Sequence, residues 1–310
     1  MDVAAAGLHH LTAITADPRA NLGFYTRVLG LRLVKRTVNF DDPSAYHLYY
    51  GDATGTPGTL LTFFHWPGAA RGRMGGGQVA GMQLAASPGS LEFWADRLRA
   101  AGYPAVPGLR FGEGLLRTVD PDGIPLEILA CPDDPRAGWT GTDVPPPHQL
   151  RGMAGAELRV RDSSRTERVL RELLGWRETA AESGRRRWSA GAGRPGQWLD
   201  LVESAAAGSG RPGSGTVHHL ALRTADVPAS EALRERLLTA GAAPSPVIDR
   251  TYFRSVYFRE PGGILLELAT DGPGFLVDET VETLGTALML PPAFEPARAA
   301  VVAALPALDA

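Results

Sequence analysis

Hydrophobic residues along this chain recur in a pattern that repeats four times. Each repeat opens with a short apolar run typical of a buried strand, and a stretch with apolar residues at three- and four-residue spacing follows, as in an amphipathic helix. The predicted strands cover residues 8–14, 79–85, 153–160 and 217–222, and the predicted helices cover 18–29, 91–101, 164–174 and 230–240. A glycine, which readily adopts the left-handed conformation that ends a helix, follows each predicted helix. These glycines are Gly30, Gly102, Gly175 and Gly241.

Three further short strands are predicted after each helix, separated by turns rich in glycine, proline and aspartate, such as residues 120–123 and 260–263. The last strands of the repeats are predicted at residues 59–64, 124–129, 197–202 and 264–269. Each repeat is therefore a β-α-β-β-β unit of about 60 residues. A solenoid of helical repeats is the alternative, but the strand content and the turns oppose it.

Glycine- and proline-rich links divide the chain into four modules and a C-terminal arm. The links lie at residues 68–77, 145–147 and 208–215. The modules, numbered 1 to 4 in chain order, are expected at residues 7–67, 78–135, 150–206 and 215–271, and the arm at residues 272–310. The predicted fold class is α+β, and the arm is expected to be an extended segment that ends in a short helix.

Composition and charge narrow the class of protein. Of the 310 residues, 44% are hydrophobic and 21% are charged, which is typical of a soluble globular protein with a sizeable core. The net charge of −3 gives no reason to expect binding to nucleic acid or to an anionic membrane. The sequence shows no signal peptide, no apolar run long enough to span a bilayer, and a single cysteine, Cys131, which allows no internal disulfide. We therefore expect a cytoplasmic protein; a homo-oligomer is allowed but not required.

Four of the seven histidines form two doublets, His9-His10 and His218-His219, at the same place in the first strands of modules 1 and 4. Adjacent residues in a strand point to opposite faces of the sheet, so only one histidine of each doublet can face a shared metal. The other must lie behind it, where it either hydrogen-bonds or packs. The apolar pattern around the doublets does not decide which histidine faces inward.

A carboxylate completes the candidate site. Glu267 lies among apolar residues in the last predicted strand of module 4, where a charge is costly unless it is paired or bound to a metal. Two imidazoles and one carboxylate on one face form the facial triad of non-haem iron(II), which leaves coordination positions for substrate and dioxygen. The alternative is that the doublets are hydrogen-bonded strand histidines and that Glu267 is the buried partner of an ion pair.

Modules 2 and 3 do not offer the same set of side chains. Counting back from the closing glycines places Met82 and Gly155 where module 1 has His10. Glu127 and Asp200 are carboxylates in the last strands of these modules. Neither module supplies a histidine beside its carboxylate, so the metal is expected elsewhere.

These residues and motifs resemble the vicinal oxygen chelate superfamily, whose fold is built from paired β-α-β-β-β modules. The similar segments are residues 7–12, 24–31, 215–220 and 260–267, and the resemblance covers nearly the whole chain. It implies two half-barrel domains, at about residues 7–135 and 150–271. Within the superfamily, the chain is most similar to hydroquinone-type ring-cleaving dioxygenases such as 2,6-dichlorohydroquinone 1,2-dioxygenase.

The resemblance also implies roles for particular residues. It implies a metal, iron(II) or alternatively manganese(II), whose ligands are His10, His219 and Glu267. It further implies active-site positions for His9, Thr12, His218, Arg250 and Tyr257. Without the resemblance, Arg250 is equally well explained as a solvated residue and Tyr257 as a packed one.

One departure from the family pattern bears on how the modules pair. Ordinary two-domain extradiol dioxygenases take their metal ligands from modules 3 and 4, whereas module 3 here has no histidine at the ligand position. We therefore expect modules 1 and 4 to form the metal-binding half-barrel, and modules 2 and 3 to form the other.

The resemblance implies an enzyme that opens a hydroquinone-like or catechol-like ring, so the expected partners are a small aromatic substrate and O2. One alternative is a glyoxalase-type isomerase or lyase. Such sites usually carry a fourth protein ligand at the position that Thr62 holds here. The second alternative is a non-catalytic small-molecule binding protein of the drug-resistance type.

The remaining candidates have simpler interpretations. His47, His65 and His148 are isolated, and we interpret them as surface or strand-end residues. The basic run at residues 185–187 is interpreted as part of a solvated turn, and Cys131 as a packing residue.

Overall fold

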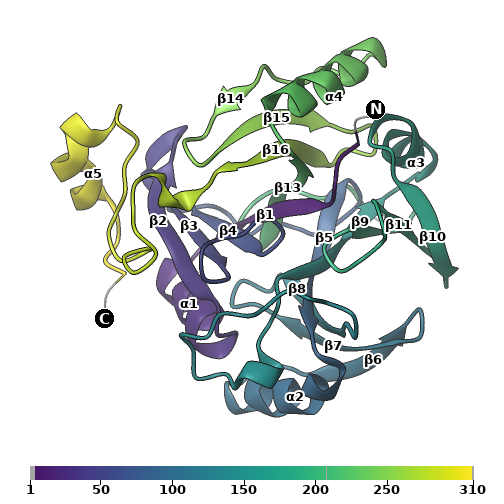
Figure 1. Ribbon diagram of the computed structural model, residues 1–310, viewed down its shortest axis with the longest axis horizontal. Helices are drawn as coiled ribbons and strands as arrows, with labels where there is room; N and C mark the ends of the chain where they lie inside the picture. Colours follow the sequence, from purple (N-terminus) through teal and green to yellow (C-terminus); the bar gives the residue numbers. More distant parts are fainter. Residues whose placement is uncertain (1–3, 207, 309–310) are drawn as a thin grey trace.

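The computed structural model describes residues 4–206 and 208–308, which form two eight-stranded sheets and a few helices (Figure 1). The first sheet contains β1 (Leu8–Thr15), β2 (Arg32–Asn39), β3 (Asp42–Gly51), β4 (Leu60–His65), β13 (Thr216–Thr224), β14 (Ile248–Asp249), β15 (Phe253–Arg259) and β16 (Leu265–Pro273). The second sheet contains β5 (Gln78–Ala86), β6 (Val106–Arg110), β7 (Glu113–Val119), β8 (Pro125–Ala130), β9 (Met153–Val160), β10 (Arg177–Glu182), β11 (Arg185–Ser189) and β12 (Trp198–Glu203). The predicted α+β fold of repeated β-α-β-β-β modules is confirmed.

Each sheet is assembled from the strands of two modules. The strand order is β14-β15-β16-β13-β1-β4-β3-β2 in the first sheet and β10-β11-β12-β9-β5-β8-β7-β6 in the second. Modules 1 and 4 therefore share the first sheet, and modules 2 and 3 share the second. In each sheet the first strands of the two modules pair antiparallel at the centre, and each lies parallel to the last strand of its own module.

The helices lie outside the sheets, with α2 and α4 on opposite sides of the molecule in Figure 1. Their bounds are α1 Pro18–Gly23, α2 Leu91–Ala100, α3 Ser164–Arg168, α4 Val227–Thr239 and α5 Arg298–Ala304. α1 and α3 continue as short π-helical turns, so the regular α-helix is shorter there than predicted. α4 begins before its predicted start because the side chain of Asp226 caps it by accepting from the backbone of Ala229. The closing glycines adopt the expected left-handed conformation, with φ of +69° at Gly30 and +83° at Gly102.

The pairing of β1 with β13 is interrupted by two β-bulges. His9 is an extra residue in β1, because Leu8 pairs with Leu222 while His10 pairs with Ala221. His218 is an extra residue in β13, because Thr12 pairs with His219 while Ala13 pairs with Val217. A bulge leaves the extra residue unpaired and bends its strand. The strict alternation of side chains expected from the sequence is therefore broken at both histidine doublets.

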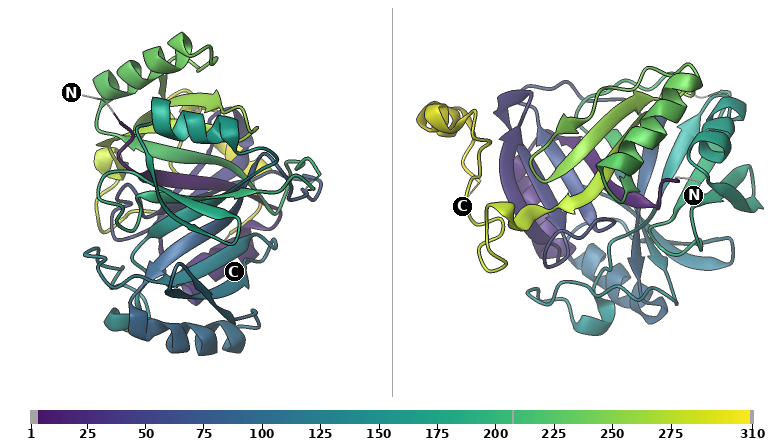
Figure 2. Two further views of the ribbon diagram at one scale, coloured as in Figure 1. Left: turned by 90° about the vertical axis from the view of Figure 1, so that its right-hand side faces the viewer. Right: turned by 45° about the horizontal axis from the view of Figure 1, so that its top comes forward.

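The C-terminal arm crosses the edge of the first sheet at β2, and α5 lies beyond that strand (Figures 1 and 2). Leu288 of the arm forms a bridge with Arg36 of β2. Lys35, which is fully buried, donates to Asp278 at 2.6 Å and also pairs with Glu279. The arm thus covers backbone groups that an open strand edge would expose. Within the described ranges, no helix is long and apolar enough to cross a membrane.

Candidate metal centre

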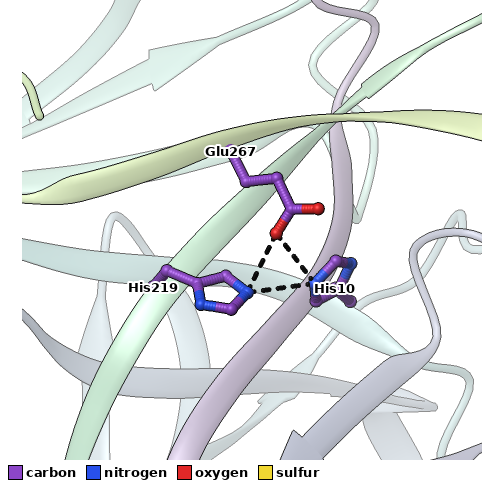
Figure 3. A group of neighbouring side chains, drawn as sticks. All are labelled: His10, His219 and Glu267. Carbon is purple, nitrogen blue, oxygen red and sulfur yellow. Dashed lines mark hydrogen bonds and ion pairs between the residues drawn. The ribbon is translucent and has the colours of Figure 1, made fainter. Parts of the chain in front are cut away.

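Three side chains from neighbouring strands converge inside the first sheet (Figure 3). His10 belongs to β1, His219 to β13 and Glu267 to β16, and these strands lie side by side. Oε2 of Glu267 lies 2.9 Å from Nε2 of His219 and 3.3 Å from Nε2 of His10. The two imidazole nitrogens are 3.2 Å apart, and all three side chains are buried. The structure therefore brings the three predicted ligands together, with one donor atom of each facing the others.

The first histidine of each doublet contacts the back of the second. Nδ1 of His9 lies 2.9 Å from Nδ1 of His10, and Nδ1 of His218 lies 2.8 Å from Nδ1 of His219. The second histidine of each doublet is thus the one that faces Glu267, which the apolar pattern of the sequence did not decide. The first histidine holds the ring of the second from behind.

The hydrogen bonds of His9 determine which nitrogen of His10 carries a proton. Nε2 of His9 donates to the carbonyl oxygen of Thr270 at 3.1 Å, because a carbonyl can only accept. A neutral His9 then accepts, through Nδ1, the proton on Nδ1 of His10. Nε2 of His10 is left with a free lone pair that faces Glu267, and this is the form of imidazole that binds a metal.

Burial keeps the imidazoles of His9, His218 and His219 neutral. It lowers the pKa of His9 to about 3 and the pKa of His218 to about 3, and the adjacent histidine adds to the effect in each case. Burial also lowers the pKa of His219, against the attraction of Glu267. Neutral imidazoles do not need to lose a proton before they can coordinate a cation.

Glu267 is ionised although it is fully buried. Burial raises its pKa, but when a neighbouring imidazole carries a proton, attraction to that charge outweighs burial and holds the pKa of Glu267 well below its usual range. Ser255 donates to Oε1 at 2.5 Å. Oε2 has no ordinary hydrogen-bond donor among the described residues and faces the two imidazole nitrogens. A carboxylate oxygen between two nitrogen lone pairs is a donor set that fits a divalent cation.

The other predicted residues lie at the same site. Oγ1 of Thr12 is 2.8 Å from Nε2 of His219. Tyr257 pairs with Glu267 in the sheet register, and its ring lies 5.7 Å from the ring of His219. Arg250 donates through Nε to the hydroxyl of Tyr257 at 3.3 Å. The structure therefore groups a hydroxyl, a phenol and a guanidinium around the three converging side chains.

A small cavity of about 30 Å³ adjoins this group. Its wall includes His10, His219, Arg250 and Tyr257, together with Phe40 and Asp41 from the turn between β2 and β3. Arg250 donates to Asp41 at 3.2 Å, in a pair whose acidic side chain is largely exposed. A larger cavity of about 820 Å³ has His218 in its wall but none of the three converging residues. The small cavity is thus the one that adjoins the three converging side chains.

The interpretation of His47 as a surface or strand-end residue is wrong. His47 is buried within β3 and lines the small cavity. Its Nε2 lies 2.9 Å from Oγ1 of Thr62, and its Nδ1 lies 2.8 Å from the hydroxyl of Tyr49. A signal was present in the sequence, because a histidine inside a run of apolar and aromatic residues at 45–51 needs a buried hydrogen-bond partner.

The basic run at residues 185–187 is not a solvated turn. It lies within β11, where Arg187 is buried and donates through Nε to Asp200 at 2.9 Å. Arg185 donates to Glu157 at 2.6 Å. The carboxylates belong to the neighbouring strands β12 and β9, and their charge stabilises the arginines inside the second sheet.

The assignment of Met82 to the place of His10 is also wrong. β5 and β9 carry two bulges of their own, with Ala80 and Ala154 as the extra residues. Aligning the bulges puts Gly81 in the place of His10, while Gly155 holds the place of His219. Counting failed because module 2 has one more residue than module 1 between the bulge and the closing glycine.

The fold and this site define a class of protein. Residues 7–128 and 152–268 match the family described as the Glyoxalase/Bleomycin resistance protein/Dioxygenase superfamily. The chain belongs to this superfamily, and the resemblance drawn from the sequence is confirmed.

Individual relatives narrow the comparison. The chain is 42% identical over 292 residues to "Putative ring-cleaving dioxygenase MhqO" of Bacillus subtilis (strain 168), a match that covers 94% of this chain and 93% of the relative. It is 32% identical over 298 residues to the chlorohydroquinone/hydroquinone 1,2-dioxygenase of Sphingobium indicum, with 93% and 92% covered.

Solved structures agree with these matches. A crystal structure from Bacillus subtilis subsp. subtilis str. 168 superimposes with a TM-score of 0.95 at 41% identity, covering 99% of this chain and 98% of that one. Glyoxalase I from Zea mays superimposes with a TM-score of 0.63 at 17% identity, covering 86% and 92%. The second likeness concerns the fold alone.

Proposed function

We propose that this chain is a ring-cleaving dioxygenase that opens a hydroquinone-like or catechol-like dihydroxy aromatic with O2. The observation that carries the proposal is the convergence of two imidazole nitrogens and a carboxylate oxygen in a chain whose near-full-length relatives are named as dioxygenases. One relative is named for chlorohydroquinone and hydroquinone, so rings with para hydroxyl groups are the first substrates to test.

We propose iron(II), with manganese(II) as the alternative, as the metal held by His10, His219 and Glu267. Donor atoms on adjacent corners of an octahedron with bonds of about 2.1 Å lie roughly 3.0 Å apart. The separations here are 2.9, 3.2 and 3.3 Å, which bracket that spacing. When bound, the ion would supply a Lewis acid for a ring hydroxyl and open positions at which substrate and dioxygen meet.

The residues behind the ligands would prepare them. His9 and His218 contact Nδ1 of the two ligand histidines, which leaves each Nε2 free for the metal. Ser255 holds Oε1 of Glu267, so that Oε2 stays turned toward the imidazoles. Such partners fix the orientation of a ligand as well as its protonation.

Arg250 and Tyr257 would stabilise negative charge on the substrate. Both line the small cavity. Burial, aided by the charge of Glu267, raises the pKa of Tyr257, so its hydroxyl stays protonated and can donate a hydrogen bond. A fixed guanidinium and a fixed hydroxyl would stabilise the negative charge that develops on a ring oxygen when it loses its proton.

The cavity must enlarge before a ring can enter. Its volume is about 30 Å³, whereas a cavity that holds benzene measures about 150 Å³. Phe40 and Asp41 lie on the turn between β2 and β3, and only the exposed pair with Arg250 ties Asp41 across the cavity wall among the described residues. We infer that this turn moves to admit the substrate.

A glyoxalase-type reaction is less well supported. The position of a fourth protein ligand is held by Thr62, whose side chain offers a hydroxyl rather than a carboxylate. Its Oγ1 is already engaged, at 2.7 Å from Thr12 and 2.9 Å from His47. A site with three protein ligands leaves more positions open for substrate and dioxygen together.

Oxygen consumption tests the proposal. Protein loaded anaerobically with iron(II) is mixed with hydroquinone, chlorohydroquinone or catechol in buffer that contains oxygen, and we expect one O2 to be consumed for each ring opened. A folded, iron-loaded protein that consumes no oxygen with any of these compounds would overturn the proposal. Conversion of a hemithioacetal without oxygen would favour the isomerase instead.

A further inference from the structure

A line of hydrogen bonds leaves the metal centre and crosses three strands of the first sheet. Oγ1 of Thr12 lies 2.7 Å from Oγ1 of Thr62, which lies 2.9 Å from Nε2 of His47. Nδ1 of His47 in turn lies 2.8 Å from the hydroxyl of Tyr49. At its near end, the line stands 2.8 Å from Nε2 of His219.

The sheet register builds this line. Thr62 of β4 pairs with Thr12 of β1 on one side and with Tyr49 of β3 on the other. All four side chains of the line are buried, so their polar atoms depend on one another rather than on bulk water. Aromatic packing holds the far end, where the ring of Phe275 lies 5.2 Å from the ring of Tyr49.

The second sheet indicates that the fold does not require such a line. Where the first sheet has Thr62 and His47, the matching positions of the second sheet hold Glu127 and Leu115. A leucine cannot continue a hydrogen-bonded line. The line is therefore a property of the half of the molecule that contains the candidate metal centre.

Hydrogen-bonding capacity gives the line a single direction. The hydroxyl of Tyr49 has one hydrogen-bond partner among the described residues, Nδ1 of His47, so its proton is donated there. Burial lowers the pKa of His47 well below its usual value, so the ring carries a single proton. That proton then lies on Nε2 and is donated to Thr62. Thr62 in turn donates to Thr12.

The last proton of the line belongs to Thr12. When Nε2 of His219 gives its lone pair to a metal, it can no longer accept from the Thr12 hydroxyl. We propose that the other three members of the line are positioning residues, which hold the Thr12 hydroxyl as a donor to an oxygen atom of a ligand beside His219. This rests on the proposed metal centre and reaction. Every proton of the line stays on its own atom.

Variants of Thr62 test the line. Thr62→Val removes the hydroxyl and keeps a similar shape, while Thr62→Ser keeps the hydroxyl. We expect Thr62→Val to lower kcat for ring opening about tenfold, the effect of one well-placed hydrogen bond, and Thr62→Ser to retain the wild-type kcat. The matched control is Thr37→Val, because Thr37 is a buried threonine of β2 whose hydroxyl has no partner among the described residues.

A double-mutant cycle separates positioning from a simple loss of stability. If Thr62 acts through Thr12, adding Thr62→Val to Thr12→Val lowers kcat no further. His47→Phe keeps the ring contact with Phe64, whose centroid is 4.3 Å away, and should show the same dependence on Thr12. Equal losses in the presence and absence of the Thr12 hydroxyl would overturn the proposal.

A second readout does not depend on turnover. In protein loaded with cobalt(II), the visible spectrum reports the ionisation of the water ligand, and a donor to that oxygen favours its deprotonated form. We expect Thr12→Val and Thr62→Val to move this transition to higher pH, and Thr62→Ser and Thr37→Val to leave it in place. An unchanged transition in Thr62→Val overturns the inference even if rings are opened. A shifted transition supports it even if no ring is opened, in which case only the proposed function fails.

Discussion

The two eight-stranded sheets share one backbone design but carry different chemistry. In the first sheet, the extra residues of the two central bulges are His9 and His218. In the second sheet, Ala80 and Ala154 occupy these places. The distortion of the strands is therefore a property of the fold, and the chemistry depends on the side chains that the bulges carry.

The second sheet keeps the carboxylate of the last strand but neutralises it. Asp200 occupies the place of Glu267. Nε of Arg187 donates to Asp200 at 2.9 Å, and the side-chain amide of Gln83 donates to it at 2.9 Å. Around Glu267 the neighbours are imidazoles with lone pairs, so a divalent cation can fill the role that a guanidinium fills permanently in the second sheet.

The space for a metal is also filled in the second sheet. A Cβ atom on Gly155 would lie 2.3 Å from the side chain of Trp198, so this indole occupies the place that His219 uses in the first sheet. The guanidinium of Arg187 stacks on the same indole at 4.4 Å from its centroid. A buried carboxylate therefore does not mark a metal site by itself. The charge and size of the neighbouring side chains determine whether a metal ion can bind there.

Removing the carboxylate of the first sheet should have the largest effect. Glu267→Gln removes the charge that would hold a divalent cation, so we expect metal content to fall to background and kcat to fall at least about 1,000-fold. Metal analysis of protein purified without chelator and an oxygen electrode measure these changes. Asp200→Asn, the same change at the matching position, should retain one metal per chain. Full metal content in Glu267→Gln would contradict the proposal that the carboxylate of the first sheet, unlike that of the second, holds a metal.

The change in the second sheet should reduce stability instead. Asp200→Asn leaves the buried Arg187 with less negative charge around it, and breaking a buried ion pair typically costs about 3 kcal/mol. Both side chains are almost fully buried, so solvent screens the pair little. We expect urea titrations to show a free energy of unfolding lower by about that amount. Unchanged stability together with lost metal would mean that the second sheet supports the metal centre directly.

The elements that the sequence predicted are those with local signals. The periodicity of apolar residues and the closing glycines indicated the four modules, because helices and turns depend on residues near one another in the chain. The doublets were recognisable because His9 and His218 occupy the same place in a repeat. Glu267 was recognisable because a charge inside an apolar run needs a partner.

The features that the sequence did not reveal depend on which strands lie side by side. The bulges at the doublets arise from the pairing of β1 with β13, which come from distant parts of the chain. His47 reaches the site because β3 lies next to β4, and Arg187 is drawn inward by Asp200 on the next strand. No local pattern reports such a register, which is set by the packing of whole sheets.

Acid should affect the first sheet more than the second. His9 and His218 have a pKa of about 3 in the folded protein, against 6.5 in the unfolded chain. Between these values the unfolded chain binds protons that the folded protein does not. Stability that is fully present above pH 6.5 is therefore lost as the pH falls toward 3, by up to about 1.4 kcal/mol per pH unit for each histidine.

Urea unfolding of the metal-free protein at pH 7 and pH 5 measures this loss. His9→Phe removes one of the two imidazoles, so the variant should lose less stability than wild type between the two pH values. The second sheet has Ala80 and Ala154 at the matching positions, so it holds no counterpart of these two imidazoles. An identical loss in wild type and variant would show that the buried imidazole of His9 is not its source.

The smallest effect is expected at the turn that separates the cavity of the first sheet from solvent. Asp41→Asn weakens a pair in which the acidic side chain is 74% exposed, and exposed pairs contribute little. We expect KM to fall about two- to threefold because the turn opens more readily, and kcat to be unchanged because Arg250 keeps its contact with Tyr257. Asp143→Asn, which weakens a comparably exposed pair with Arg97 of α2, should change neither constant. A higher KM with a lower kcat would instead mean that Asp41 holds Arg250 against the substrate, so that the cavity of the first sheet would be preorganised by this pair rather than closed by it.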